Sequence, residues 1–342
     1  MPFWILKFGF LTPEFWLPQM IKLQNRTYKI ILLIALLGCI LFPSIASGFW
    51  IRLLTGIFLY AILAQGLNII AGFTGYAAFG NMIFFGLGAY TVGILMVKAG
   101  ISFFPSLIAA AAVGIIVAIL IGLPLLRLKG HYFALASLGA AEAVRQIMDN
   151  LIGLCGGAMG LTLPQMAGKP AQVNLSFYYL IFSLLLISFT ATYTISKNRL
   201  GYALKAIKAN EEAADAMGIN TTFYKIVAWA ISGLFTAMAG AIHAYWFTFI
   251  EPATVFDVMI VVKLFVILLL GGAGTVMGPL YGAFIFEGIS EIVWSRFLNL
   301  HMGILGILVI LIVFFIPNGM IDMVRRGFRL KTILDTIREE KV

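Results

Sequence analysis

The chain has 342 residues, of which 62% are hydrophobic and 11% charged, and its mean hydropathy is +1.03. A soluble domain carries about 25% charged residues and about half apolar ones. The composition therefore excludes a disordered chain, a disulfide-rich secreted module and almost any cytosolic enzyme. The apolar residues occur in blocks of about 15 to 25, the length that crosses roughly 30 Å of hydrocarbon as a helix, and they predict an all-α polytopic membrane protein.

About ten apolar segments predict transmembrane helices, some of them short or broken. They are residues 30–48, 50–71, 79–98, 104–126, 132–150, 176–195, 225–249, 257–271, 279–294 and 302–317. The chain is accordingly divided into an interfacial or cytoplasmic N-terminal segment, residues 1–29, and a transmembrane domain, residues 30–317, with a long polar loop at 196–224. A basic tail follows at residues 318–342.

The formal net charge is +9, and the positive charges are unevenly distributed. Most of the 23 Lys and Arg residues gather in four segments: Met1–Lys29, Arg127–Lys129, Lys197–Lys225 and Arg325–Lys341. With ten spans, an even number of crossings separates each segment from the next, so all four lie on one side. The positive-inside rule makes that side the cytoplasm. We therefore expect a multi-pass protein of the cytoplasmic (inner) membrane with both termini cytoplasmic, in contact with lipid and without a nucleic-acid partner.

Two glycine-rich runs interrupt the apolar pattern, one at Gly72–Gly75 and one at Gly271–Pro279. Broken backbone in a membrane leaves polar groups that lipid cannot satisfy, so it is tolerated where protein covers it or water fills a cavity. Paired breaks in the two halves of a chain point to a transporter's pathway. Close helix packing is the alternative, with Gly271, Gly274 and Gly278 as structural glycines, because Gly274, Gly278 and Gly282 recur at every fourth residue.

The polar loop between the sixth and seventh spans, Arg199–Asn220, is longer than a connection between neighbouring helices needs to be. Ala, Leu, Lys and Glu dominate it as far as Met217, which predicts a helix that Gly218 terminates. Small apolar residues form a shallow strip beside the charged positions. Such a helix fits a groove of another protein, and the alternative is a solvated surface helix.

Within this loop, Glu212–Ala213–Ala214 followed by Gly218 resembles the EAA loop of ABC importer permeases, the element that docks on the ATPase subunit. Further blocks are similar to the branched-chain amino acid permease family. They are Gly66–Leu67–Asn68, Thr74–Gly75, Phe85–Tyr90, Arg127–Ala134 with Glu142 and Arg145, Gly156–Gly157 with Gly160–Leu161, and Gly271–Thr275 with Gly278–Pro279. The resemblance extends from about Gly66 to Pro317.

The resemblance implies the membrane-spanning permease subunit of an ATP-driven importer for branched-chain or related amino acids. Its partners would be a second permease subunit, two ATPase subunits and an extracytoplasmic substrate-binding protein, which would face Leu151–Leu175 and residues 250–256. The residues expected to couple the chain to the ATPases are Glu211, Glu212, Ala213, Ala214 and Gly218.

The chain has no phosphate-binding loop of the form GxxxxGK[ST], so we assign it no ATPase activity of its own. The expected protein is not an enzyme and binds no cofactor or metal, while ATP and Mg belong to the partner subunits. An intramembrane enzyme is a poor alternative, because the sequence has no GxSxG or HExxH motif. A self-sufficient secondary transporter or channel for a small polar solute is the stronger alternative, and the dependence of transport on ATPase subunits distinguishes it.

A substrate pathway is expected along the broken spans and the charges inside predicted helices: Thr74, Gly75, Tyr76, Asn81, Tyr90, Glu142 and Glu287. After the Thr–Gly pair this chain departs from the family, which usually shows Gln, Ser and His where Tyr76, Ala78 and Asn81 stand. The solute, an amino acid, urea or an amide, therefore stays open.

The ionisable side chains inside predicted spans have two interpretations, a substrate role or buried pairs that fix the helix register. Glu142 and Arg145 are one helical step apart and can pair within a helix. Glu287 and Glu291 share a helix face and repel, and Lys263 from the neighbouring span is a candidate partner.

Overall fold

The computed structural model describes residues 37–44, 46–296, 303 and 306. The predicted N-terminal segment 1–29, the predicted span 302–317 and the tail 318–342 lie outside these residues, apart from two isolated positions of that span, and the span 30–48 is described only in part. The chain divides into two compact units, Met1–Ile51 and Arg52–Val342. The arrangement discussed below is that of the second unit.

The described residues form an all-α membrane protein, as the composition predicts. Five helical segments are long and apolar enough to cross a membrane: Gly48–Gly72, Phe103–Leu125, Pro170–Lys197, Thr221–Phe247 and Pro252–Gly271. A sixth apolar helix, Asn81–Val97, is shorter. The chain is therefore a multi-pass membrane protein.

In the first half of the chain, each predicted span from residue 50 onward is a helix close to its predicted bounds. The helix α3 (Gly48–Leu67) continues into a π-helical turn, η1 (Asn68–Gly72), and a short irregular segment leads to α4 (Asn81–Val97). The helices α5 (Phe103–Leu125) and α6 (His131–Asn150) follow. A connecting region then contains α7 (Ile152–Cys155), a 3₁₀ turn η2 (Gly157–Met159) and β1 (Leu161–Thr162).

The second half begins with the long helix α8 (Pro170–Lys197), and two short helices follow it, α9 (Arg199–Ala209) and α10 (Glu211–Ala216). The next apolar helix, α11 (Thr221–Phe247), leads through β2 (Phe249–Ile250) and α12 (Pro252–Val255) to α13 (Val258–Gly271). The described fold ends with α14 (Gly278–Arg296), which packs against α13.

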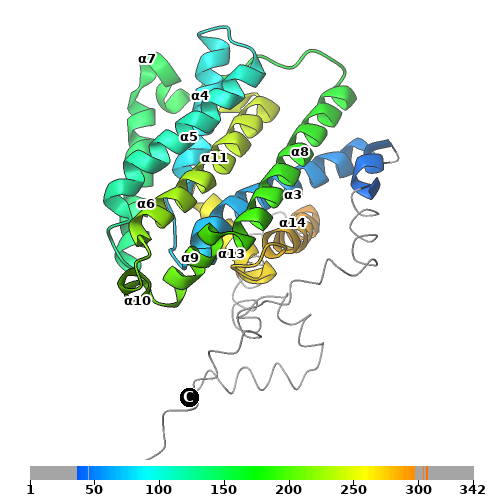
Figure 1. The fold of residues 1–342 in the computed structure, drawn as a ribbon. Coiled ribbons are helices and arrows are strands. Elements are labelled where there is room, and N and C mark those ends of the chain that lie inside the picture. The colour runs from blue at the N-terminus through cyan, green and yellow to red at the C-terminus, as the bar shows by residue number, and fades with distance from the viewer. Residues whose placement is uncertain (1–36, 45, 297–302, 304–305, 307–342) are drawn as a thin grey trace, which may run out of the picture. The chain divides into compact units, whose positions relative to one another are not determined.

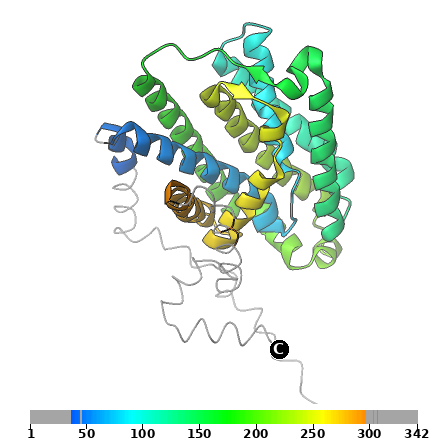
Figure 2. The same ribbon diagram turned by 180° about the vertical axis from the view of Figure 1, so that it is seen from behind.

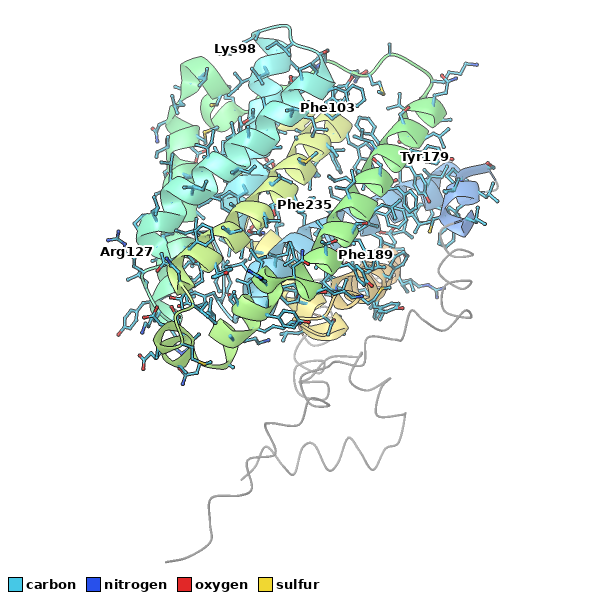
Figure 3. All side chains as sticks on the ribbon, viewed as in Figure 1. Lys98, Phe103, Arg127, Tyr179, Phe189 and Phe235 are labelled. Carbon is cyan, nitrogen blue, oxygen red and sulfur yellow. The ribbon has the colours of Figure 1, made fainter. Side chains whose placement is uncertain are left out.

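The helices α4, α5, α6, α8 and α11 run roughly parallel to one another, alternately up and down, so their connections gather at two ends (Figure 1, Figure 2). One end, called the basic end below, carries the connections 126–130 and 198–220, and the opposite end carries 98–102 and 151–169. In Figure 3, Arg127 lies at the basic end and Lys98 at the opposite end. At the opposite end β1 pairs antiparallel with β2, Leu161 facing Ile250. This alternation is the one that the spacing of the basic segments predicts.

The core of the unit is α11, which packs most extensively against α4 and α5. Its Trp229 is fully buried and meets the rings of Phe84 and Phe133 edge to face. The crossing of α4 and α11 is close because Gly88 lies directly on the backbone of Ala237, where no Cβ fits. Small residues at a crossing allow helix backbones to approach within van der Waals distance in a membrane.

Candidate functional site

The polar loop 198–220 is not the single continuous helix that its composition predicts. The helix α9 ends at Asn210, whose backbone is extended, and the Asn210 side chain then caps α10 by accepting a hydrogen bond from the Ala213 amide at 3.0 Å. Asparagine favours an N-cap over a helix interior because its side chain competes for backbone donors. The second break, at Gly218, has φ +86 and follows the last turn of α10, as predicted.

The first residue of α10, Glu211, is held by a buried cation. Its carboxylate accepts a hydrogen bond from Lys225 on α11, with Nζ and Oε1 2.6 Å apart, and another from the Tyr76 hydroxyl. Lys225 also donates to the Tyr76 hydroxyl at 3.1 Å and to the Leu126 carbonyl at the end of α5, at 2.9 Å. The Lys225 side chain is 2% exposed and that of Glu211 17%. We call Tyr76, Glu211 and Lys225 the anchor cluster.

The anchor cluster joins four segments that are distant in sequence: the irregular stretch before α4, the end of α5, α10 and the start of α11. A buried ammonium keeps its charge only when its donors are satisfied, and here a carboxylate, a hydroxyl and a carbonyl accept from Lys225. The cluster therefore fixes the position of α10 relative to the core.

The anchor cluster predicts an acid-dependent loss of stability. Burial alone would raise the pKa of the Glu211 carboxyl, but the hydrogen bonds from Lys225 and Tyr76 outweigh it and hold the pKa below its ordinary value near 4.5. A depressed pKa means that the stabilisation is fully present above the ordinary value and is lost as the pH falls through the lower folded-state pKa. We expect thermal denaturation in detergent between pH 6 and about pH 3 to show a smaller acid-dependent decrease for Glu211→Gln than for the wild type. An equal decrease in both proteins would contradict this role.

The neighbouring residue, Glu212, lies on the other side of α10 and faces outward. Its side chain is 82% exposed, and among the described residues its ion-pair partner is Lys129, which is itself 60% exposed, at 3.1 Å. Ala213 and Gly218 are exposed too, whereas Ala214 is buried against the protein. Met217, at the end of the same helix, is 84% exposed. The helix thus has one anchored face and one outward face that carries an acid and an apolar side chain.

The two predicted glycine interruptions meet each other near the basic end. The Asn68 amide in η1 donates to the Thr275 carbonyl at 2.8 Å and accepts from the Gly274 amide at 2.8 Å. Gln65 on α3 donates to the Val276 carbonyl at 2.9 Å. We call these hydrogen-bonded segments, residues 65–72 and 272–277, the junction. Protein groups therefore cover the broken backbone here, which is a condition for such breaks in a membrane.

A lysine of α9 reaches the junction. The Lys208 ammonium donates to the Gly72 carbonyl at 2.9 Å, at the end of the π-helical turn. The polar loop thus makes polar contacts with the interior of the fold through Glu211 and Lys208, and its apolar residues Leu204, Ile207 and Ala214 are buried as well.

The residues predicted for the substrate pathway do not form one cluster. Thr74 bonds back to the Ile70 carbonyl of its own helix, and Gly75 follows with φ +79. Tyr76 belongs to the anchor cluster. Asn81 is fully buried between α4 and α11, where it donates to Thr236 at 3.1 Å and accepts from Ser232 at 2.8 Å.

Tyr90 lies farther along α4, toward the opposite end. It is buried and stacks on Phe256, with ring centroids 6.2 Å apart, and its hydroxyl has no hydrogen-bond partner within the part of the chain that the structure describes.

The predicted pair of Glu142 and Arg145 forms within α6, with Nη2 and Oε1 2.8 Å apart, and both side chains are partly exposed. Lys263, the candidate partner of Glu287 and Glu291, interacts electrostatically with Glu287 but forms no salt bridge with either carboxylate among the described residues. Glu287 Oε1 is a buried atom that no described residue hydrogen-bonds. The Lys263 ammonium lies instead over the Tyr60 ring, 5.6 Å from its centroid. Lys263 and Glu287 are near enough to interact electrostatically, but the Lys263 ammonium is oriented toward the Tyr60 ring.

The three predicted structural glycines occupy two kinds of position. Gly271 and Gly278 lie against each other where the chain turns from α13 to α14, so close that neither has space for a Cβ. Gly274 is not on a helix face with Gly278 and Gly282, as the spacing suggested, because it lies in the turn with φ +82. The Gly274 amide donates a hydrogen bond to the Asn68 side-chain oxygen, so this glycine is part of the junction.

Sequence reasoning missed the roles of Lys225 and Lys208. Both were counted only among the basic residues that mark the cytoplasmic side. One signal was available for Lys225, because a lysine within an apolar helix requires a nearby acceptor or anion. No pattern in the sequence indicates that its partner is Glu211 rather than Glu212.

A family model and several known proteins are similar to most of the chain, and they agree on one family. Residues 49–313 match a family model described as "Branched-chain amino acid transport system / permease component". The high-affinity branched-chain amino acid transport system permease protein LivM of Salmonella typhimurium is 27% identical over 94% of this chain and 81% of that protein.

Two other relatives extend the comparison. The corresponding LivH protein of Escherichia coli strain K12 is 25% identical over 77% of this chain and 91% of its own. A probable LivM permease of Methanocaldococcus jannaschii is 23% identical over 77% of this chain and 90% of its own. No solved structure matches the chain. Because the family model covers most of the chain, the protein belongs to the family of branched-chain amino acid transport permease components.

Proposed function

We propose that the chain is the membrane-spanning permease subunit of an ATP-driven importer for branched-chain or related amino acids, and that the loop 199–220 couples it to separate ATPase subunits. The observation that carries the proposal is the two-sided character of α10. Glu211 is anchored in the core while Glu212 and Met217 face outward.

The six-residue helix α10 can transmit force only if the rest of the fold holds it in place. A helix this short is unstable alone, because nucleation is unfavourable and few hydrogen bonds form. Its position is set by the Asn210 cap and the anchor cluster. A partner that holds the outward face and moves it therefore also moves Tyr76 and the start of α11, instead of unwinding a loose loop.

The proposed assembly follows from the family. The chain resembles both LivM and LivH relatives, which supports a second permease subunit of the same fold. Two ATPase subunits with their ATP and Mg would bind at the basic end, through Glu212, Ala213 and Gly218. An extracytoplasmic substrate-binding protein would bind at the opposite end, near Leu151–Leu175 and residues 250–256. The chain itself would carry no cofactor, in an inner membrane with both termini cytoplasmic.

Within this proposal the pathway residues fall into two groups, those with a buried polar atom available to a solute and those whose polar groups are bonded within the fold. Tyr90 supplies a buried hydroxyl without a partner among the described residues, and Glu287 supplies a buried carboxylate oxygen in the same condition. Thr74, Gly75, Asn81 and Glu142 are satisfied within the fold and would shape the pathway instead of binding the solute.

The test is a charge reversal of the outward acid, Glu212→Lys, in proteoliposomes that contain the chain, its partner permease, the ATPases and the binding protein. We expect ATP-driven uptake of radiolabelled leucine to fall by at least about tenfold, because a like charge at a docking contact costs several kcal/mol. The melting temperature should stay unchanged, because the lost surface pair contributes at most about 1 kcal/mol.

The matched control is Lys197→Glu, an exposed charge reversal at the basic end that lies outside α9 and α10. It should leave uptake near the wild-type level. Normal assembly and normal uptake in Glu212→Lys would overturn the proposed coupling. Leucine flux through the purified chain without ATPase subunits would instead support a self-sufficient transporter or channel.

A further inference from the structure

At the junction, a single side-chain amide, that of Asn68, pairs with the backbone of the facing segment. The Asn68 amide pairs with the backbone of residues 274 and 275 in both directions, one hydrogen bond donated and one accepted. A side-chain amide has the same donor and acceptor geometry as a peptide group. Asn68 therefore holds the segment 272–277 as a neighbouring strand would, although no strand is present at this place in the described chain.

The contact between the two segments is as close as backbone allows. A Cβ on Gly72 would meet the Asn68 side chain and the Gly274 amide nitrogen, the latter at 2.7 Å. A Cβ on Gly274 would meet the Gly72 carbonyl at 2.8 Å. The two breaks thus lie in close contact with the Asn68 side chain between them, and in the described part of the chain the hydrogen bonds that join residues 65–72 to residues 272–277 are those of Asn68 and Gln65.

The junction also contains a buried hydrogen-bond acceptor that has no donor among the described residues. Gln65 donates to Val276, but its Oε1 is buried and no described residue hydrogen-bonds it. A buried acceptor without a donor is unfavourable relative to a state in which it is hydrated or bonded. The π-helical turn that carries Asn68 is also a form that α-helices adopt mostly as short bulges at functional sites. Both features favour a segment that has a second arrangement.

Lys208 connects this segment to the coupling loop. It lies on α9, two residues before the break at Asn210, and its ammonium donates to the last carbonyl of η1, that of Gly72. A displacement of α10 and α9 therefore acts on η1 directly. The anchor cluster acts in parallel on the residues that follow it, through Tyr76.

We propose that the junction is a closed gate near the basic end of the transport pathway, with Asn68 as its latch and Lys208 as the positioning residue that ties the latch to the coupling loop. The proposal rests on the proposed function, since it takes the chain to be a transporter driven through α10. It assigns to Asn68 and Lys208 roles that are separate from ATPase docking.

The latch is tested with Asn68→Asp, which keeps the acceptor for Gly274 but sets an oxygen against the Thr275 carbonyl. A cysteine at Val276, in a background with Cys39 and Cys155 replaced by Ala, reports opening through its labelling by a membrane-impermeant maleimide. We expect labelling to be about tenfold faster than with Asn68 intact, since losing one buried hydrogen bond shifts an equilibrium by roughly that factor. ATP-independent leakage of radiolabelled leucine from proteoliposomes should rise in parallel.

Two further variants keep this test decisive. Asn68→Leu removes both hydrogen bonds without adding charge, and it replaces Asn68→Asp if that variant does not fold. Asn150→Asp, at an exposed side chain on α6, is the matched amide control and should leave labelling and leakage unchanged. If folded Asn68 variants are labelled at the control rate and leak no more leucine than the control, Asn68 does not hold the junction closed.

The connection is tested with Lys208→Met, which keeps the length of the side chain and removes its ammonium. We expect ATP hydrolysis by the assembled complex to persist while leucine uptake per ATP falls by about tenfold, because a charged hydrogen bond to the gate is lost. Lys197→Met is the control, since Lys197 lies on α8, outside the loop 199–220, and its exposed ammonium donates to the Tyr193 hydroxyl of the same helix.

The outcomes separate this inference from the proposed function. Absence of ATP-driven uptake in the wild-type complex would refute the function, and the maleimide labelling would still decide whether Asn68 closes the junction. Normal wild-type uptake together with full coupling in Lys208→Met would refute the role of Lys208 and leave the function standing.

Discussion

Replacement of Glu211 by Ala should destabilise the protein far more than the same replacement of Glu212. Lys225 is buried at the start of α11, and without Glu211 its charge would keep only a hydroxyl and a carbonyl as acceptors. Removing one partner of a buried ion pair costs about 3–5 kcal/mol, whereas an exposed pair contributes at most about 1 kcal/mol. Thermal denaturation of the two variants in one detergent measures the difference.

The double variant Glu211→Ala with Lys225→Met separates the charge effect from the loss of packing. Replacing both members by apolar groups removes the uncompensated charge, so the double variant should be more stable than Glu211→Ala alone. A double variant that is less stable than either single one would contradict the argument. Uptake should stay low in the double variant, because α10 would no longer be tied to Tyr76 and Lys225.

The course of the chain through the membrane was largely predictable from the sequence. The apolar blocks predict the long helices of the described chain with errors of a few residues at their ends, because burial in lipid imposes a length and a composition that are local properties. The short helices α7, α9, α10 and α12 do not correspond to apolar blocks. Of the four basic segments, the two within the described residues, Arg127–Lys129 and Lys197–Lys225, lie at the same end, as their spacing predicts. Gly218 was recognised as a helix terminator because a positive φ favours glycine.

The anchor cluster could not be predicted in this way. Tyr76 and Glu211 are 135 positions apart, and the hydrogen bond between them depends on how α4, α10 and α11 pack. The sequence motif marks Glu211 and Glu212 alike, and only the orientation of α10 after its cap at Asn210 directs one inward and the other outward. Tyr76 was assigned to the pathway from its position beside the first break, and in the structure its hydroxyl donates a hydrogen bond to Glu211 of the polar loop.

The junction was predictable only in part. The sequence identifies the two glycine runs as paired breaks. It does not predict that Asn68 joins them, because a single amide in an apolar segment gives no periodic signal. The spacing of Gly274, Gly278 and Gly282 matched a helix face, yet a turn with positive φ occupies the first position. Spacing is a weak guide where glycine serves turns and close contacts alike.

Replacement of Gly88 by Val should prevent the central helices from packing. The added Cβ would overlap the Ala237 backbone of α11, and a backbone cannot move aside as the end of a side chain can. Overpacking a well-filled contact costs about 1–3 kcal/mol, and at a backbone crossing we expect the upper part of that range or more. Gly240 lies in the reciprocal position, against the backbone of Phe85, so Gly240→Val should act in the same way.

The control is Gly139→Ala on α6, because nothing lies within 4 Å of a Cβ built there. Replacing a helix-interior glycine by alanine should leave the protein unchanged or stabilise it by roughly 0.5–1 kcal/mol. The amount of folded chain recovered from membranes and its melting temperature in detergent measure all three variants. A Gly88→Val variant as stable as Gly139→Ala would show that α4 and α11 are not in backbone contact. The placement of Tyr76, just before α4, against Lys225 on α11 would then lose its basis.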